Sequence, residues 1–103
     1  MVTHPAIDHK VAIELDSLGF ALSDLPVVAA EWDQLDEGER ASWSQDWDQL
    51  MGAVEVVLEP RLCSGTLGAK DRGRYLDLRR VLMEALPILD HLQLSRPRID
   101  LTL

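Results

Sequence analysis

The stretch from residue 36 to residue 59 constrains the fold most, because it carries a complete helix signal. Asp36 and Glu39 have the spacing of a capping box, in which two side chains satisfy the first free backbone N–H groups of a helix. Large apolar side chains then recur every three or four residues and define one helix face: Trp43, Trp47, Leu50, Met51, Val54, Val57 and Leu58. Pro60 lacks a backbone N–H and is expected to end the pattern. The sequence therefore predicts a helix over residues 37–59, about 35 Å long at 1.5 Å per residue.

A second long helix is predicted over residues 69–94. Its apolar residues step by three and four, which is the spacing of a heptad seam: Tyr75, Leu78, Leu82, Ala85, Leu89 and Leu92. Pro87 removes a backbone hydrogen bond, but the seam continues in phase, so we expect a kink there. Residues 60–68 are rich in Pro, Gly, Ser and Thr and are expected to form the loop of an antiparallel hairpin.

Two shorter helices are expected before this hairpin. The first begins at Thr3 and ends at Gly19, which is a good C-terminal stop. After a connector, the second begins near Pro26, and whether residues 26–59 form one helix or two stays open. The chain is therefore expected to be an all-α domain, a small three- to four-helix bundle over residues 1–94.

The last residues, 95–103, are expected to leave the bundle as an extended arm. Pro97 restricts the residue before it to an extended backbone, and Ile99, Leu101 and Leu103 alternate with polar residues. Such an arm can dock on its own bundle, pair with a partner or fray.

Charge is distributed unevenly along the chain. The formal net charge is −8, but residues 1–59 carry thirteen acids against Lys10 and Arg40, while residues 60–103 carry five acids against eight basic residues. The simplest interpretation is that the two halves pair across the bundle; an acidic surface that faces a partner is the alternative. Overall acidity disfavours nucleic-acid binding, because contacts with phosphate dominate that affinity. The N-terminus lacks the basic and apolar regions of a signal peptide, and no stretch reaches 18 apolar residues, so we expect a cytoplasmic protein.

No motif specific to a catalytic or metal-binding class is present in the sequence. His4, Asp8 and His9 lie near one predicted helix end and Asp90 and His91 near another, so a metal site would require these ends to meet. Helix-start electrostatics account for several members of an acidic cluster, which comprises Asp33, Asp36, Glu37, Glu39, Asp46 and Asp48. Cys63 is alone and cannot form an intrachain disulfide. We therefore predict no cofactor and no metal.

Two groups of side chains are candidates for contact with partners. The apolar group combines large side chains of both long helices, because Trp is enriched at interaction hot spots: Trp43, Trp47, Met51, Tyr75, Leu78 and Leu82. The basic group is Arg72, Arg74, Arg79 and Arg80, for which a solvated face or pairing with the acidic helix is the simpler interpretation.

These features favour a small helical protein–protein interaction or regulatory module that is not catalytic. The two apolar faces exceed what one hairpin and two short helices can cover, so we expect first of all self-association, as a homodimer, and otherwise a complex with another protein. One alternative is a helical-bundle enzyme or a ligand- or metal-binding protein that uses carboxylates. A further alternative is an antitoxin-like acidic protein or one that mimics nucleic acid.

Overall fold

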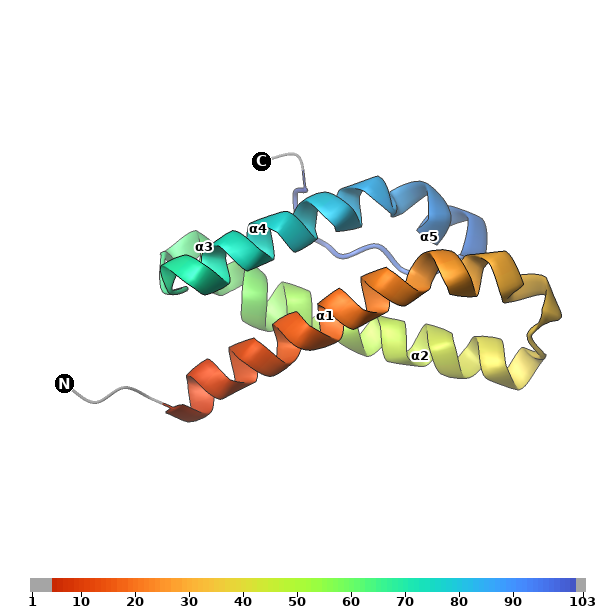
Figure 1. The fold of residues 1–103 in the computed structure, drawn as a ribbon, viewed down its shortest axis with the longest axis horizontal. Helices are drawn as coiled ribbons and strands as arrows, with labels where there is room; N and C mark the ends of the chain where they lie inside the picture. Colours follow the sequence, from red (N-terminus) through yellow and green to blue (C-terminus); the bar gives the residue numbers. More distant parts are fainter. Residues whose placement is uncertain (1–4, 102–103) are drawn as a thin grey trace.

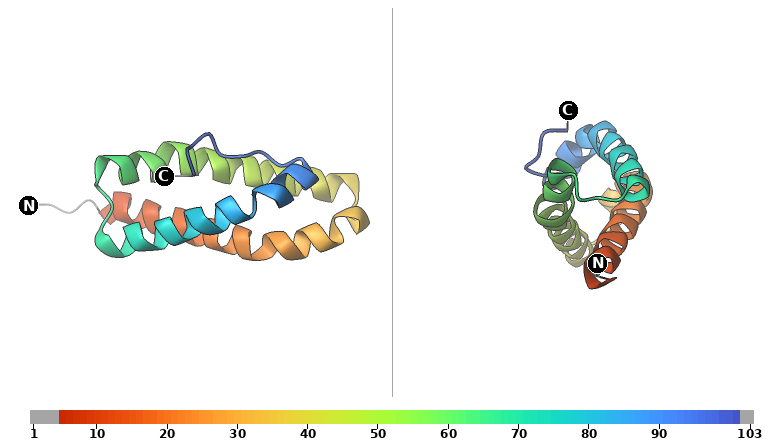
Figure 2. Two further views of the ribbon diagram at one scale, coloured as in Figure 1. Left: turned by 90° about the horizontal axis from the view of Figure 1, so that it is seen from above. Right: turned by 90° about the vertical axis from the view of Figure 1, so that its left-hand side faces the viewer.

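Three antiparallel helical rods form a bundle, seen from the side in Figure 1 and along its axis in Figure 2. The computed structural model describes the backbone of residues 5–101 and the side chains of residues 9–101. Within that range there is no β-strand. The predicted all-α bundle is therefore confirmed.

The first rod is one continuous helix, α1 (Pro5–Glu31), which corrects the expectation of two short helices. Gly19 and Pro26 both lie inside it. Pro26 interrupts the hydrogen bonding of the helix at a cost of about 3 kcal/mol. Burial of Leu22 and Leu25 offsets this cost, because each fully buried leucine contributes about 1.5–3 kcal/mol.

A tight corner joins α1 to the second rod. It consists of the 3₁₀ turn η1 (Trp32–Gln34) followed by extended backbone at Leu35. The Arg40 side chain donates to the carbonyl oxygens of Trp32 and Asp33 at 2.9 and 3.2 Å and fastens the turn. Residues 26–59 therefore do not form one continuous helix.

The predicted capping box opens α2 (Glu37–Ala53). The backbone N–H of Glu39 donates to the Asp36 carboxylate at 2.7 Å, and the backbone N–H of Asp36 donates back to Glu39 at 3.3 Å. The bond from the Glu39 backbone is the main cause that lowers the pKa of Asp36. This prediction is confirmed down to the individual atoms.

The sequence predicted that the helix would end at Pro60, but the second rod continues beyond this residue. After α2 it widens into the π-helical turn η2 (Val54–Leu58) and continues as α3 (Glu59–Ser64). Pro60 stands in the first turn of α3, where a missing N–H is tolerated. The rod ends where Gly65 adopts a left-handed conformation with φ of 72°, so the loop to the third rod is shorter than expected.

The third rod is α4 (Ala69–Glu84) followed by α5 (Leu86–Leu92). The break falls at Ala85, and Pro87 sits in the first turn of α5, so the predicted kink near Pro87 is confirmed. Gln93 then adopts a left-handed conformation, and the N–H of Leu94 bonds to the carbonyl oxygen of Leu89 at 2.8 Å. This cap ends the helix and turns the chain back along the bundle.

The core lies along the bundle axis, and all three rods contribute to it. Its buried side chains include Val11, Leu15, Leu18, Leu22 and Leu25 from α1, Trp47, Met51, Val54 and Leu58 from the second rod, and Tyr75, Leu82, Leu89 and Leu92 from the third. The α1 stripe extends well past Gly19, which explains why the helix continues through that residue. No helix in the described range is long and apolar enough to cross a membrane.

The C-terminal segment, residues 93–101, docks on the bundle between the second and third rods (Figure 2). Trp47 Nε1 donates to the Ser95 carbonyl oxygen at 2.8 Å, and Ser95 Oγ donates to Asp48 at 2.6 Å. Further along, the Arg98 backbone N–H donates to Glu55 at 2.8 Å. Of the three possibilities for the arm, docking on its own bundle is therefore the one observed, with Leu103 outside the described residues.

Candidate functional site

A buried ionic network lies where the second rod, the third rod and the C-terminal segment meet. Arg79 is 5 % exposed and is the only buried charged side chain in the described part of the chain. Its Nε lies 3.2 Å from the Glu59 carboxylate, and its Nη2 donates to the carbonyl oxygen of Asp100. Tyr75 donates its hydroxyl to Glu59 at 2.6 Å. We call these four residues the Arg79 network.

The surroundings of the Arg79 network alter the chemistry of Tyr75. Burial raises the pKa of the phenol well above its ordinary value, and the hydrogen bond to Glu59 raises it further. Tyr75 is therefore a neutral donor at physiological pH. Because the side chains of the network pair with one another and with the Asp100 backbone, the network joins the second rod, the third rod and the C-terminal segment.

The apolar residues that the sequence marked for partner contact take different places. Trp47, Met51, Tyr75 and Leu82 are buried in the core of their own chain. Leu78 is half-buried beside α1, near Gly19. Trp43 is also half-buried and stacks on Trp47 with ring centroids 5.8 Å apart. Of the six, we carry only Trp43 forward as a contact residue.

The four arginines of the basic group do not share one face. Arg79 is buried in its network, Arg74 pairs with Asp16 of α1 at 2.7 Å, and Arg80 lies 3.4 Å from Asp77. Arg72 is exposed. Two of the basic residues thus do pair with the acidic half across the bundle.

The predicted helix ends that would have to meet for a metal site lie apart. α1 begins at one end of the bundle, whereas α5, with Asp90 and His91, lies at the other (Figure 1). His4 and the side chain of Asp8 are outside the described residues. Among the side chains that are described, no three His, Cys, Asp or Glu gather as metal ligands. Cys63 is exposed near the end of α3.

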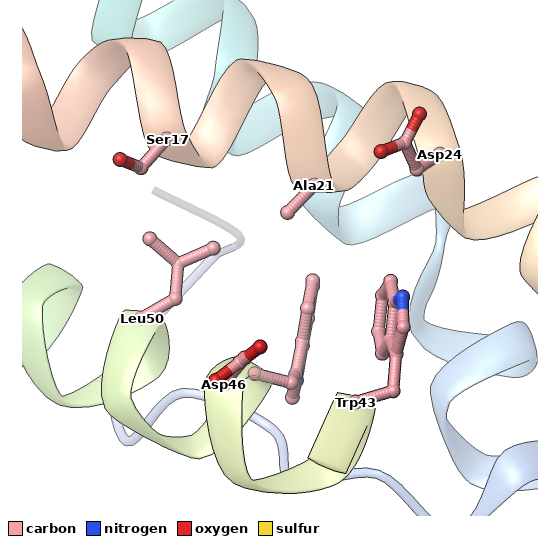
Figure 3. Close-up of a pocket in the computed structure, with 7 residues that line it drawn as sticks. Ser17, Ala21, Asp24, Trp43, Asp46 and Leu50 are labelled. Carbon is pink, nitrogen blue, oxygen red and sulfur yellow. The ribbon is translucent and has the colours of Figure 1, made fainter. Parts of the chain in front are cut away.

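Three adjoining hollows lie between α1 and α2 and share lining residues. The central hollow, of about 230 Å³, is lined by Ser17, Ala21, Asp24, Trp43, Asp46, Trp47 and Leu50. In Figure 3, Trp43 and Leu50 of α2 point toward α1, and Ala21 of α1 faces them across this space. The second hollow, about 580 Å³, shares Trp43 and Asp46 with the central one, and the third, about 250 Å³, shares Ser17, Asp46 and Leu50 with it. We call the three together the α1–α2 groove.

The rims of the α1–α2 groove follow heptad spacing on both helices. On α1 the lining residues step by three and four: Glu14, Ser17, Ala21, Asp24, Val28 and Glu31. On α2 the same spacing gives Glu39, Ser42, Asp46, Gln49 and Ala53. Sequence reasoning missed these seams, because most of their members are small or charged and the search for periodicity followed apolar residues.

The groove is strongly acidic. Among the described residues, the lining contains no lysine or arginine but six carboxylates: Glu14, Asp24, Glu31, Asp36, Glu39 and Asp46. Asp36 and Glu39 are engaged in the capping box. The apolar part of the lining includes Trp43, Leu50 and Val28. The groove therefore combines an apolar floor with negatively charged rims.

Comparison of the chain with protein-family models, with curated proteins and with solved structures found no match. The function is therefore inferred from the geometry of the bundle alone.

Proposed function

We propose that this chain is a small cytoplasmic, non-catalytic interaction module that binds another protein in the α1–α2 groove. The observation that carries the proposal is the groove itself, which is open along two helices and has heptad-spaced rims. Two helices with such rims present the surface on which a further helix packs in a four-helix bundle. An enzyme site, in contrast, needs ionisable groups buried in a pocket, and the one buried charge among the described side chains is committed to the Arg79 network.

Self-association, which the sequence also favoured, has a different surface available. Ile13, Phe20 and Val27 are spaced by seven on α1 and are 48, 72 and 59 % exposed. This spacing places them on one outward stripe, which supports contact with a second copy as a second candidate. The stripe does not include the lining residues of the α1–α2 groove, so both contacts are compatible with one another.

Site-specific photo-crosslinking in the native cells tests the groove as a docking surface. A photoreactive phenylalanine analogue replaces Ser42, which lines the groove, and in a control chain it replaces its exposed neighbour Ala41, which lines none of the three hollows. We expect a discrete adduct from position 42 and much less from position 41. An adduct of twice the mass of the chain identifies a second copy. Equal yields at the two positions, or no adduct at either, would contradict the proposed function.

A further inference from the structure

We infer that the α1–α2 groove accepts a basic amphipathic helix from another protein, an inference that rests on the interaction role proposed above. Such a helix has apolar residues at heptad spacing on one face, with Lys and Arg on both sides of them. Bound in the groove, it becomes the fourth rod of the bundle.

Charge complementarity selects a basic partner. Four groove carboxylates, those of Glu14, Asp24, Glu31 and Asp46, form no hydrogen bond or ion pair with the described residues. The three groove acids on α1 lie within about 26 Å, counted as 17 residues at 1.5 Å each, and the acids of the second rod line the same groove, so their fields add. Lysines and arginines flanking the apolar face of a helix would meet acids from both rims.

The same charges argue against a second copy of this chain in the groove. Its α1 and α2 are acidic and would be repelled. Its arginines are largely engaged within their own chain: Arg74 with Asp16, Arg79 with Glu59, and Arg96 with Asp90. A copy that used these arginines in the groove would have to break their pairs, and its exposed Lys70 and Arg72 lie together only in the first turn of α4.

The shape of the groove favours a helix over an extended segment. Both rims have the three-and-four spacing that receives the side chains of a facing helix. Small residues occupy several rim positions, including Ser17, Ala21, Ser42 and Ala53, and let a helix backbone come close. Trp43 lies in the middle of the floor, where a large apolar side chain of the partner can rest on it.

The neighbouring groove shows how this chain accommodates an extended segment, and it does so differently. There Trp47, Glu55 and Arg79 form hydrogen bonds with backbone groups of the C-terminal segment. The described lining of the α1–α2 groove has few side-chain donors for backbone carbonyls, namely Ser17, Ser42, Trp43 and Gln49, among six carboxylates and no lysine or arginine. A helix satisfies its own backbone and has no need of such donors.

Three synthetic peptides of about 18 residues, a length that matches the rims, test the chemistry of the occupant. One is a Leu/Lys peptide with an amphipathic helical pattern, the second has Glu in place of Lys, and the third is the Leu/Lys composition scrambled so that no apolar face forms. Calorimetric titration of the whole chain should show binding of the first peptide, weakened by salt. Equal affinity for the scrambled peptide, or no binding of the first, would overturn the inferred partner class.

Matched charge variants show whether binding occurs in the groove. Asp24→Asn with Asp46→Asn removes two groove charges, whereas Asp77→Asn with Glu84→Gln removes two charges from exposed residues of α4. We expect the groove variant to bind the Leu/Lys peptide roughly tenfold more weakly than the unsubstituted chain, because it loses two exposed ion pairs of modest strength with the peptide. The control variant, whose charges lie outside the groove, should bind less than twofold more weakly. Equal affinity of both variants would overturn the inference.

The outcomes separate this inference from the proposed function. If position 42 forms an adduct while the Leu/Lys peptide binds no better than its controls, the module stands and the partner class is wrong. If the adduct has twice the mass of the chain and the Leu/Lys peptide does not suppress it, a second copy occupies the groove and the inference is likewise wrong.

Discussion

Of the two grooves described on this bundle, one is filled by the chain itself and the other is open. The groove between the second and third rods is filled by the C-terminal segment, whose Leu94 and Pro97 are buried there. The α1–α2 groove stays open, and its half-buried Trp43 is left at the surface. The filled groove supplies donors and acceptors for backbone groups, while the open groove supplies acids at heptad spacing. We conclude that the chemistry of each groove indicates the kind of chain segment that fits it.

The Arg79 network is the strongest element of the filled groove, so the largest effect is expected there. Arg79→Met leaves the Glu59 carboxylate, which is 16 % exposed, without its cation and should lower the free energy of unfolding by about 3 kcal/mol, the lower end of the range for a buried pair. Urea denaturation followed by circular dichroism measures this change. If the loss proved to be below about 1 kcal/mol, the network would not be what fastens the filled groove.

Arg80→Met is the matched control for that measurement. Arg80 has no buried partner. Its only described ion pair is with Asp77, and both side chains are largely exposed. Exposed pairs of this kind contribute little, so we expect a change of less than about 0.5 kcal/mol. A large loss here would mean that charge removal from α4 destabilises the bundle irrespective of burial.

The pH dependence of stability provides the second test of the filled groove. The raised pKa of Tyr75 keeps its phenol protonated in the folded chain, whereas the phenol of the unfolded chain ionises near pH 10. Stability from this group is therefore complete below pH 10 and is lost as the pH rises further, by at most about 1.4 kcal/mol per pH unit. Tyr75→Phe should remove this loss.

Tyr75 is the only tyrosine, so its ionisation can be observed directly by ultraviolet absorbance. Tyrosinate absorbance should emerge together with unfolding and not before it. An ordinary titration near pH 10 in the folded chain would show that the hydroxyl is open to solvent, contrary to its hydrogen bond with Glu59.

The sequence predicted the elements best where local chemistry decides them. The Asp36–Glu39 capping box and the kink near Pro87 depend on neighbouring residues, and both predictions are confirmed. The continuity of α1 through Gly19 and Pro26 depends on burial of Leu22 and Leu25 against other rods. This tertiary contribution outweighs the local stop signals, and a single stretch of sequence does not contain it.

Both grooves also depend on contacts that a single stretch of sequence does not reveal. The alternation of Ile99 and Leu101 indicated an extended arm, but its hydrogen bonds with Trp47 and Glu55 bring together residues that are more than 40 apart in sequence. The open groove was missed as a unit, although Asp36, Glu39 and Asp46 had been noted as part of an acidic cluster. Its rims become visible only when polar and small residues are included in the search for heptad spacing.

Asp46 and Asp48 allow the two grooves to be compared with one substitution each, and the smallest effect is expected here. Both acids are exposed on α2, but Asp46 lines the open groove and Asp48 accepts a hydrogen bond from Ser95 in the filled one. Asp46→Ala relieves repulsion among the groove carboxylates, and Asp48→Ala removes the contact with the C-terminal segment. The gain in helix propensity is the same in both variants.

We therefore expect Asp46→Ala to unfold at higher urea concentration than Asp48→Ala, with a difference of about 1 kcal/mol in the free energy of unfolding. Added salt should narrow this difference by reducing the stability that Asp46→Ala gains, because screening already weakens the carboxylate repulsion that this substitution removes. Only Asp48→Ala should increase hydrogen exchange in the C-terminal segment. If the two variants were equally stable, the acids of the open groove would already be balanced within the chain, and the argument for a basic partner would lose its main support.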